Sequence, residues 1–255
     1  MTDYRLIAFD LDDTLAPSKS AMDPSMVPLF SELLATHEVC VISGGQIEQF
    51  RSQFLTSIGD VPESDLARLH LMPTCGTQYY RYVDGTWTQI YAENLTETER
   101  SDAMAALKSS ALSLGLWETT TWGPVLEDRG SQVTFSALGQ DAPLDAKKAW
   151  DPTGTKKSAL RDKVAEQLPA LEVRSGGSTS IDITRKGIDK AYGMNKLTEL
   201  TGIPISDMLF VGDRLDEAGN DYPVVRTGVT TFAVSDWKDT ADLIEKLLSG
   251  EPNHA

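Results

Sequence analysis

Residues 5–15 read Arg-Leu-Ile-Ala-Phe-Asp-Leu-Asp-Asp-Thr-Leu, and this stretch decides how the rest of the chain is interpreted. Its apolar run, Leu6 to Phe9, is typical of a short central strand that is buried on both faces of a sheet. Three acids and a threonine follow immediately: Asp10, Asp12, Asp13 and Thr14. Because α/β sheets bind ligands in the crevice at the carboxyl ends of their strands, we expect these side chains to line a site.

The two carboxylates of Asp10 and Asp12 lie only two residues apart, so they repel each other and lose hydration when they are buried. A bound cation would hold them together. Oxygen ligands without a nearby His or Cys favour Mg²⁺ over zinc. The alternative reading is a strand followed by an Asx turn, which is the commoner explanation for an isolated Asp-x-Asp.

The composition describes a soluble globular protein, with 40% hydrophobic and 24% charged residues over a length of 255. That length allows one large domain or two smaller ones that share a crevice. The 38 acidic residues outnumber the 23 basic ones and give a net charge of −15. Such a surface repels nucleic acids and anionic membranes, so an anionic substrate must be gathered by a local basic patch or a metal.

Neither cysteines nor long apolar segments indicate a secreted or membrane protein. Cys40 and Cys75 are too few for a disulfide framework, and Cys40 lies in an apolar run that favours a reduced, buried thiol. No stretch approaches the length of a membrane span, and the chain starts directly with a predicted strand. We therefore expect a cytoplasmic protein.

Three further segments deliver polar side chains in a similar way. The apolar run 39–42 ends in Ser43-Gly44-Gly45, and the run 208–211 ends in Gly212-Asp213, shortly before Asn220-Asp221. Lys190 opens a predicted helix at 191–200, at the end where the macrodipole disfavours a lysine. Taken singly, these features also fit a turn, a loop of solvated acids and a surface lysine. Their conjunction favours a site.

The middle of the chain changes pattern. Helices are predicted at 96–114, with a capping box from Thr96 to Glu99, and at 155–167. Strands are predicted at 125–128, 132–138, 171–174 and 179–184. Residues 86–186 therefore form a predicted α+β insert. The flanking parts, 1–85 and 187–255, contain the other predicted elements: helices at 23–36, 46–56 and 240–248, a strand pair within 69–82 around Gly76, and a late strand at 231–234.

The four polar segments resemble, in order, the motifs of the haloacid dehalogenase (HAD) superfamily. The resemblance implies an α/β fold with a Rossmann-like core, a parallel sheet and an inserted α+β cap of the C2 type, as in subfamily IIB. It also implies that Asp10 is the nucleophile and Asp12 the general acid/base. Ser43 would hydrogen-bond the phosphoryl group, Gly44 would let the backbone approach it, and Lys190 would neutralise charge. The implied Mg²⁺ ligands are Asp10, Asp12, Asp213 and Asp221.

Within that branch, several stretches of the chain are similar to eukaryotic-type phosphomannomutase. They are Glu127-Asp-Arg-Gly, Ser136-Ala-Leu-Gly, Gly176-Gly-Ser-Thr-Ser-Ile-Asp-Ile and Gly187-Ile-Asp-Lys, and Gly219-Asn-Asp follows in the core. The resemblance implies that the cap binds the distal phosphate through arginines and contacts the sugar phosphate through a Ser-x-Asp pair. The substrate-binding residues that it implies are Arg129, Ser180 and Asp182, together with Lys19 and Lys147 at the positions of two further arginines.

The departures from that family concern arginines. Gln140 stands where one arginine is expected, Lys147 stands at a second such position, and Ser18 or Lys19 stands at a third. Arg grips phosphate with two parallel bonds, Lys acts as a point charge, and Gln carries no charge. A mutase must hold one phosphate in the cap while the other reacts, whereas a phosphatase has no such need.

The sequence therefore favours a Mg²⁺-dependent sugar-phosphate phosphatase that works through an aspartyl phosphate. The first alternative is a phosphomannomutase, which would use the same aspartates. The second is a catalytically silent phosphosugar-binding protein, which the joint presence of Asp10, Asp12, Lys190 and Asp213 disfavours. The expected partner is a small phosphorylated sugar and neither nucleic acid nor a membrane, with a homodimer through the cap as a further expectation.

Overall fold

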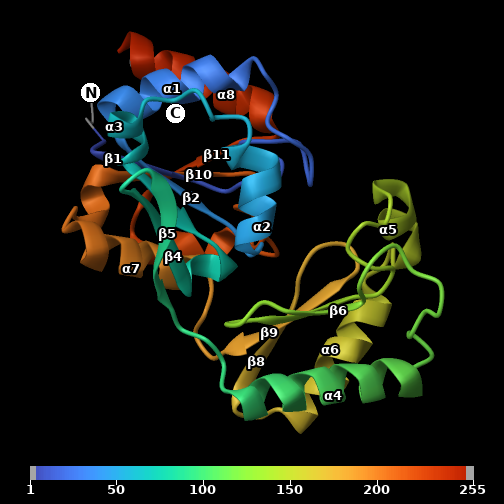
Figure 1. The fold of residues 1–255 in the computed structure, drawn as a ribbon. Helices are drawn as coiled ribbons and strands as arrows, with labels where there is room; N and C mark the ends of the chain where they lie inside the picture. The colour runs from blue at the N-terminus through green and yellow to red at the C-terminus, as the bar shows by residue number, and fades with distance from the viewer. Residues whose placement is uncertain (1–3, 251–255) are drawn as a thin grey trace. The chain divides into compact units, whose positions relative to one another are not determined.

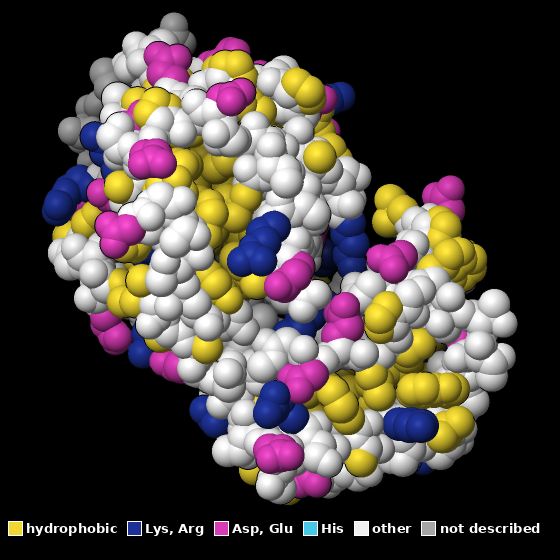
Figure 2. Space-filling view, viewed as in Figure 1, with side chains coloured by type: hydrophobic (Ala, Val, Ile, Leu, Met, Phe, Trp, Pro, Cys, Tyr) yellow, Lys and Arg dark blue, Asp and Glu magenta, His cyan; other side chains and the backbone are white. Residues whose placement is uncertain are grey.

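The computed structural model describes residues 4–250, which divide into two compact units. The core unit consists of residues up to Tyr91 and from Asp189 onward, and the cap unit consists of Ala92–Ile188. The sequence placed these divisions at residues 86 and 187. On the face drawn in Figure 2, the Lys and Arg side chains of each unit are dispersed among acidic and uncharged ones.

The core unit is built on a seven-stranded sheet with the strand order β11-β10-β1-β2-β3-β4-β5. Its strands are β1 (Leu6–Phe9), β2 (Glu38–Ile42), β3 (Leu69–Met72), β4 (Gln78–Val83), β5 (Thr86–Ala92), β10 (Met208–Gly212) and β11 (Thr230–Ala233). The five strands from β11 to β3 are parallel, and β4 is antiparallel to β3. β5 extends this sheet, although its residues lie in the segment that the sequence assigned to the cap.

Helices cover both faces of this sheet because its central strands are apolar on both faces. All residues of β1 and β10 are buried. The helices α1 (Met26–Thr36) and α8 (Trp237–Ser249) pack on one face, and α7 (Lys190–Thr201) packs on the other (Figure 1). The smaller elements are α3 (Glu63–Leu66) and 3₁₀ turns at Thr74–Gly76, Ile205–Asp207 and Tyr222–Thr227.

Two predicted helices differ from the structure in detail. The helix expected at 23–36 begins at Met26, because the Asp23 side chain accepts bonds from Ser25 and forms a turn before the helix. The helix expected at 46–56 consists of α2 (Ile47–Phe50) followed by a π-helix, Arg51–Leu55. A π-helical turn inside a helix is rare and is frequently found at functional sites.

The cap unit is a four-stranded antiparallel sheet with helices packed on one of its faces (Figure 1). The strands β6 (Leu126–Asp128), β7 (Val133–Ser136), β9 (Ser180–Arg185) and β8 (Leu171–Ser175) are neighbours in that order. The helices are α4 (Glu97–Ser113), α5 (Leu144–Trp150) and α6 (Thr155–Gln167), and the predicted capping box of α4 is confirmed. Alternation along β7 and β9 sends Phe135 and Ile183 into the apolar core, and it leaves polar residues for the other face.

These two units confirm the predicted fold class, an α/β core with a mostly parallel sheet and an α+β insert. The parallel order places the carboxyl ends of β1, β2 and β10 at one edge of the core sheet. Among residues 4–250, none of the helices combines the length and hydrophobicity that crossing a membrane requires.

A pair of glycines lets α7 approach this edge closely. Gly193 lies in α7, and a Cβ there would lie 2.3 Å from Ile42 Cδ1 and 2.8 Å from the carbonyl oxygen of Cys75. A Cβ on Gly76 would lie 2.7 Å from the Cα of Gly193, so neither position accommodates a side chain. The turn Thr74–Gly76 and α7 are therefore in backbone contact.

We predict that Gly193→Ala destabilises the fold. Alanine favours helices by about 1 kcal/mol over glycine, but overpacking against the backbone of Cys75 costs about 1–3 kcal/mol. The urea midpoint should fall with an unchanged m-value. Gly59→Ala is the matched control, because its Cβ would have only the Thr56 oxygen nearby, at 4.0 Å. Equal midpoints for the two variants would contradict the close approach of α7.

Candidate active site

Neighbouring strand ends bring the predicted acids together. β1 pairs in parallel with β10, with Phe9 opposite Val211, and the Asp10 amide donates to the Val211 carbonyl at 3.0 Å. Asp10 and Asp213 therefore follow adjacent strands at the same edge. Ser43 follows β2, the neighbour of β1 on the other side. The parallel sheet places three of the predicted residues side by side.

Lys190 occupies the centre of this edge. Its side chain is 1% exposed, and its Nζ lies 2.5 Å from Asp10 Oδ1 and 2.5 Å from Asp221 Oδ1. Burial alone would lower the pKa of Lys190, but the two carboxylates outweigh it and raise the pKa above its ordinary value. The lysine is therefore a fixed cation between two acids.

The position of Lys190 follows from local capping. Asp189 is the N-cap of α7, and its side chain accepts from the amide of Tyr192 at 3.1 Å. Arg226 forms an ion pair with the same Asp189 carboxylate. The cap and the ion pair fix the first turn of α7, so Lys190 starts from a rigid backbone.

Three carboxylates around the lysine form a group that could hold a metal ion. One oxygen each from Asp10, Asp213 and Asp221 lies within 4.8 Å of the others. Burial raises the pKa of Asp10 well above its ordinary range, although Lys190 offsets part of that effect. Burial and the neighbouring Asp221 raise the pKa of Asp213 to about 6. Burial is the main cause of both shifts, and the neighbouring carboxylates add to them.

The donor set fits a hard divalent cation. All three side chains offer carboxylate oxygens, and the group contains neither His nor Cys. With Lys190 as the ammonium partner, three ionised carboxylates leave a net charge of −2 at the cluster, which a divalent ion would neutralise. This geometry supports a metal site at Asp10, Asp213 and Asp221, while Asp12 does not belong to the group.

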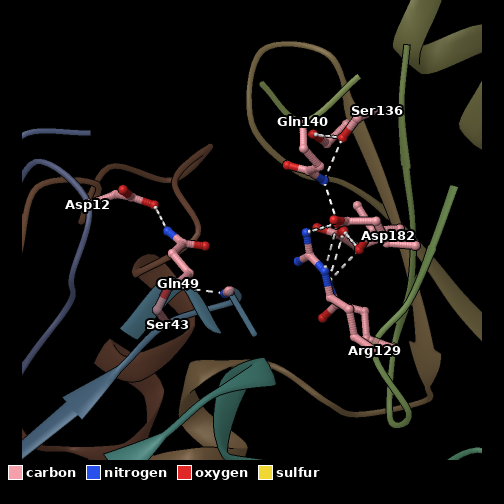
Figure 3. A network of polar contacts seen from close by, with 12 residues as sticks. Asp12, Ser43, Gln49, Arg129, Ser136, Gln140 and Asp182 are labelled. Atoms are coloured by element: carbon pink, nitrogen blue, oxygen red, sulfur yellow. Dashed lines mark hydrogen bonds and ion pairs between the residues drawn. The ribbon is translucent and has the colours of Figure 1, made fainter. Parts of the chain in front are cut away.

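Asp12 is directed toward helix α2 and the π-helix instead. Its Oδ2 accepts from Gln49 Nε2 at 2.7 Å, and its Oδ1 accepts from Gln53 Nε2 at 3.0 Å. The backbone amide of Lys19 adds a third bond to Oδ1 at 2.7 Å. Figure 3 shows the Gln49 amide pointing at the Asp12 carboxylate. The contact of Lys19 with Asp12 is thus made by its backbone amide, whereas the prediction was that the Lys19 side chain binds the substrate.

The loop after β2 is fixed by backbone bonds. The Ser43 hydroxyl, on a side chain that is buried, accepts from the amide of Gly45 at 3.1 Å, and the Ser43 carbonyl accepts from the amide of Cys75 at 2.9 Å. A Cβ on Gly44 would meet only the Cys75 sulfur, at 4.0 Å. A Cβ on Gly45 would lie 2.2 Å from Gln49 Oε1, so the Gln49 side chain would have to move to accommodate any other residue at position 45.

In the cap unit, Arg129 is paired with an acid. Its Nη2 lies 2.6 Å and its Nε 3.2 Å from Glu127 Oε2, and the guanidinium side chain is 9% exposed. Gln140 donates to the same Glu127 oxygen at 2.7 Å and to Ser136 Oγ at 2.8 Å. Lys147 Nζ donates to the Gln140 carbonyl at 2.6 Å. Glu127 therefore binds both Arg129 and Gln140, and Figure 3 shows Arg129, Gln140 and Ser136 in one network of polar contacts.

The predicted Ser-x-Asp pair lies on the polar face of the same sheet. Asp182 Oδ1 accepts from Gln132 Nε2 at 2.9 Å and from Thr134 Oγ1 at 2.7 Å. Ser180 Oγ lies 3.3 Å from Ser136 Oγ. β7 and β9 are paired here, with Thr134 opposite Asp182. The cap unit thus presents a connected group of hydroxyls, amides and carboxylates.

The sequence did not predict several residues that bind Asp12 or that belong to the polar group of the cap unit. Gln49 and Gln53 are spaced four apart on a predicted helix, which could have placed them on one face, but glutamine carries no specific signal. Gln132 and Thr134 could have been found from the alternation of the strand 132–138. Glu127 stands two residues before Arg129, and its role as the partner of that arginine was not predicted.

Comparison with known families identifies the fold and the class of chemistry. The family model described as eukaryotic phosphomannomutase matches residues 72–250. Phosphomannomutase 1 of Homo sapiens and of Mus musculus are each 23% identical to this chain, over 98% of it and 94% of the relative. The phosphomannomutase of Schizosaccharomyces pombe is 22% identical over 96% of this chain and 94% of its own.

Solved structures of two phosphatases share the fold. IMP-bound, N-terminally truncated IMP-nucleotidase of Plasmodium falciparum matches with a TM-score of 0.69 at 13% identity, over 96% of this chain and 68% of that one. Trehalose-6-phosphate phosphatase of Aspergillus fumigatus matches with a TM-score of 0.57 at 16% identity, over 97% of this chain and 93% of that one. Since the matched family model covers well over half of the chain, the chain belongs to the eukaryotic phosphomannomutase family within the HAD superfamily and is a phosphoryl-transfer enzyme.

Proposed function

We propose that this enzyme is a Mg²⁺-dependent phosphatase that removes the phosphoryl group of a sugar monophosphate through an aspartyl phosphate on Asp10. The observation that carries the proposal is the buried Lys190, whose ammonium lies 2.5 Å from both Asp10 and Asp221. A buried cation beside a nucleophilic carboxylate stabilises the anionic phosphoryl oxygens that approach it.

Magnesium is the ion that the cluster fits best, because the three donors are hard oxygens and leave room for water and phosphate ligands. Asp10, Asp213 and Asp221 would hold it. When bound, Mg²⁺ would neutralise charge on the transferring phosphoryl group as a Lewis acid.

In the first half-reaction, a carboxylate oxygen of Asp10 forms a bond to phosphorus while the bond from phosphorus to the sugar oxygen breaks. Asp12 donates a proton to that leaving oxygen, and Lys190 and the Ser43 hydroxyl face the equatorial oxygens. In the second half-reaction, water attacks the phosphorus of the aspartyl phosphate and gives its proton to Asp12. Asp10 is released as a carboxylate together with inorganic phosphate.

The charges of the cap unit favour hydrolysis over mutase chemistry. Glu127 neutralises Arg129, and the side chain at position 140 is an uncharged glutamine. Asp182 adds a further negative charge to the same polar group. A mutase needs strong recognition of a second phosphate, which Arg provides best. Hydroxyl, amide and carboxylate groups instead suit the hydroxyls of a sugar.

Phosphomannomutase activity is the second candidate, because the matched family model, residues 72–250, includes the whole cap unit. The two candidates use the same aspartates and differ in whether a bisphosphate is retained. Their test is a panel of sugar phosphates assayed with and without a hexose 1,6-bisphosphate, in which free phosphate and isomerised sugar are both measured. Release of phosphate without isomerisation supports the phosphatase, and bisphosphate-dependent isomerisation overturns it.

We predict that Asp10→Asn abolishes turnover while the fold is retained, because a neutral amide is too weak a nucleophile to accept the phosphoryl group. Circular dichroism should be unchanged, and the pair of Lys190 with Asp221 should persist. Asp23→Asn is the matched control, since it makes the same change at a carboxylate in the turn before α1. Activity of Asp10→Asn above a few per cent of the native level would exclude Asp10 as the nucleophile.

We predict that the metal-free enzyme loses stability as the pH rises. Asp213 has a folded pKa of about 6 against an ordinary value of 3.8, so the folded state binds more protons in that interval. The free energy of unfolding therefore falls between about pH 4 and about pH 6 and stays lower above it. Mg²⁺ should remove this loss because it favours the ionised ligands.

The measurement is the melting temperature across that pH range, in chelator and in Mg²⁺. Asp213→Asn should flatten the profile in chelator and reduce the rise that Mg²⁺ causes. Ca²⁺ should bind but inhibit turnover, because its looser coordination misplaces the nucleophile. Full activity in excess chelator would refute the metal assignment.

We predict that Glu127→Gln tightens the binding of a hexose bisphosphate more than that of a hexose monophosphate. The substitution keeps the shape of the side chain but removes the charge that neutralises Arg129. The gain should be about 10- to 100-fold, since a hydrogen bond to a charged group contributes about 1.5–3 kcal/mol. The exposed Glu118→Gln is the charge-matched control. An equal change in affinity for both ligands would show that Arg129 does not bind a distal phosphate.

A further inference from the structure

The amides that hold Asp12 form a small assembly that the proposed mechanism has not used. Gln49 and Gln53 each bind a different oxygen of Asp12, at 2.7 Å and 3.0 Å, and the Lys19 amide binds Oδ1 as well. Three donors on two carboxylate oxygens fix both the position and the rotation of the carboxylate plane. We call the pair Gln49 and Gln53 the amide clamp.

The local backbone is shaped around this amide clamp. Gln49 lies in α2 and Gln53 in the π-helix, so both side chains emerge on the same face one turn apart. Gly45 leaves the space into which the Gln49 side chain folds, since a Cβ there would lie 2.2 Å from Gln49 Oε1. The Gln53 carbonyl accepts from the Met22 amide at 2.7 Å and anchors the π-helix to the loop before α1.

Gln53 occupies its position at a cost in stability. Its side chain is 3% exposed, and its Oε1 has no hydrogen-bond partner among the described residues. A buried acceptor without a partner is destabilising, and an apolar residue of the same shape would avoid that penalty. The presence of an amide at this position is therefore explained by the two hydrogen bonds that its Nε2 donates, to Asp12 and to the Ser20 carbonyl.

The clamp also explains why Asp12 is separate from the metal-binding group. Asp12 is two residues from Asp10, yet the carboxylate oxygens that converge belong to Asp10, Asp213 and Asp221. Without the two amides, the Asp12 side chain could rotate and add a fourth carboxylate to the cation. A carboxylate that coordinates the metal has a lower pKa, because the cation favours its ionised form, and is therefore a weaker general acid/base.

We propose that Gln49 and Gln53 are positioning residues that keep Asp12 out of the coordination of the metal and aimed at the oxygen that gains or loses a proton. The inference rests on the proposed role of Asp12 as general acid/base. The clamp acts in both half-reactions of a sugar phosphate. When the leaving group departs as a stable anion, the amide clamp acts only in the second half-reaction. There, water transfers a proton to Asp12 while the water oxygen bonds to phosphorus.

The first test uses p-nitrophenyl phosphate, whose nitrophenolate leaves without a proton. In Gln49→Glu, which keeps the side-chain shape but replaces the donor with an anion, the first turnover should slow less than about 3-fold, whereas steady-state turnover should fall about 10-fold or more. Phosphoenzyme should accumulate in rapid-quench samples. Gln53→Leu should give the same pattern with unchanged or higher thermal stability. Gln89→Leu, at an exposed site in β5, is the matched control.

The second test does not depend on turnover. Calorimetric titration with Mg²⁺ should show tighter binding by roughly 3- to 10-fold in Gln49→Leu and Gln53→Leu, because Asp12 becomes free to add ligand charge. Unchanged or weaker Mg²⁺ binding would overturn the clamp, and so would equal slowing of the two half-reactions. Failure of the proposed function has a different signature: native protein without phosphoenzyme and without phosphate release, whatever the Mg²⁺ affinities of the variants.

Discussion

The candidate active site depends on one buried ammonium group held between two buried carboxylates. Lys190 lies 2.5 Å from Asp10 and from Asp221, and the lysine and both acids are almost fully buried. Breaking such a pair by removing one partner costs about 3–5 kcal/mol, because a charge is left in a medium of low dielectric. Asp213 adds negative charge that the lysine cannot balance. Under the proposed function, a cation and an anionic substrate would bind at this site together.

The backbone around this group is also fixed by a turn that carries none of the proposed catalytic residues. The turn Thr74–Gly76 donates its Cys75 amide to the Ser43 carbonyl and its Thr74 amide to the Gly45 carbonyl, so it supports the loop after β2. Thr74 and Cys75 both have positive φ, at 50° and 56°. Non-glycine residues adopt this conformation at a cost, and such strain concentrates at functional sites. Gly193 lets α7 pack against the same turn, which links Lys190 to Ser43 through one rigid layer.

The sequence predicted those parts of the site that follow from strand periodicity. Asp10 and Asp213 end apolar runs, and parallel strands align such ends without further information. Strand periodicity does not predict the direction in which a side chain points, because that direction depends on partners that can come from distant segments. Gln49 and Gln53 draw Asp12 away from the other acids, and they belong to a helix in which glutamine is an ordinary surface residue. Glu127 lies only two residues from Arg129, but the sequence does not show that these two side chains bind each other.

Under the proposed function, the charges in the cap unit decide whether water or the sugar accepts the phosphoryl group from Asp10. In either reaction the phosphoryl group on Asp10 passes to an oxygen nucleophile whose proton Asp12 removes. A mutase must keep a phosphorylated sugar bound until its second hydroxyl reaches Asp10, which requires strong anion recognition. Glu127 neutralises Arg129, and Gln140 adds no charge, so a released sugar meets little electrostatic restraint. A change of one or two side chains in the cap unit would then separate a phosphatase from a mutase, while the candidate active site stayed the same.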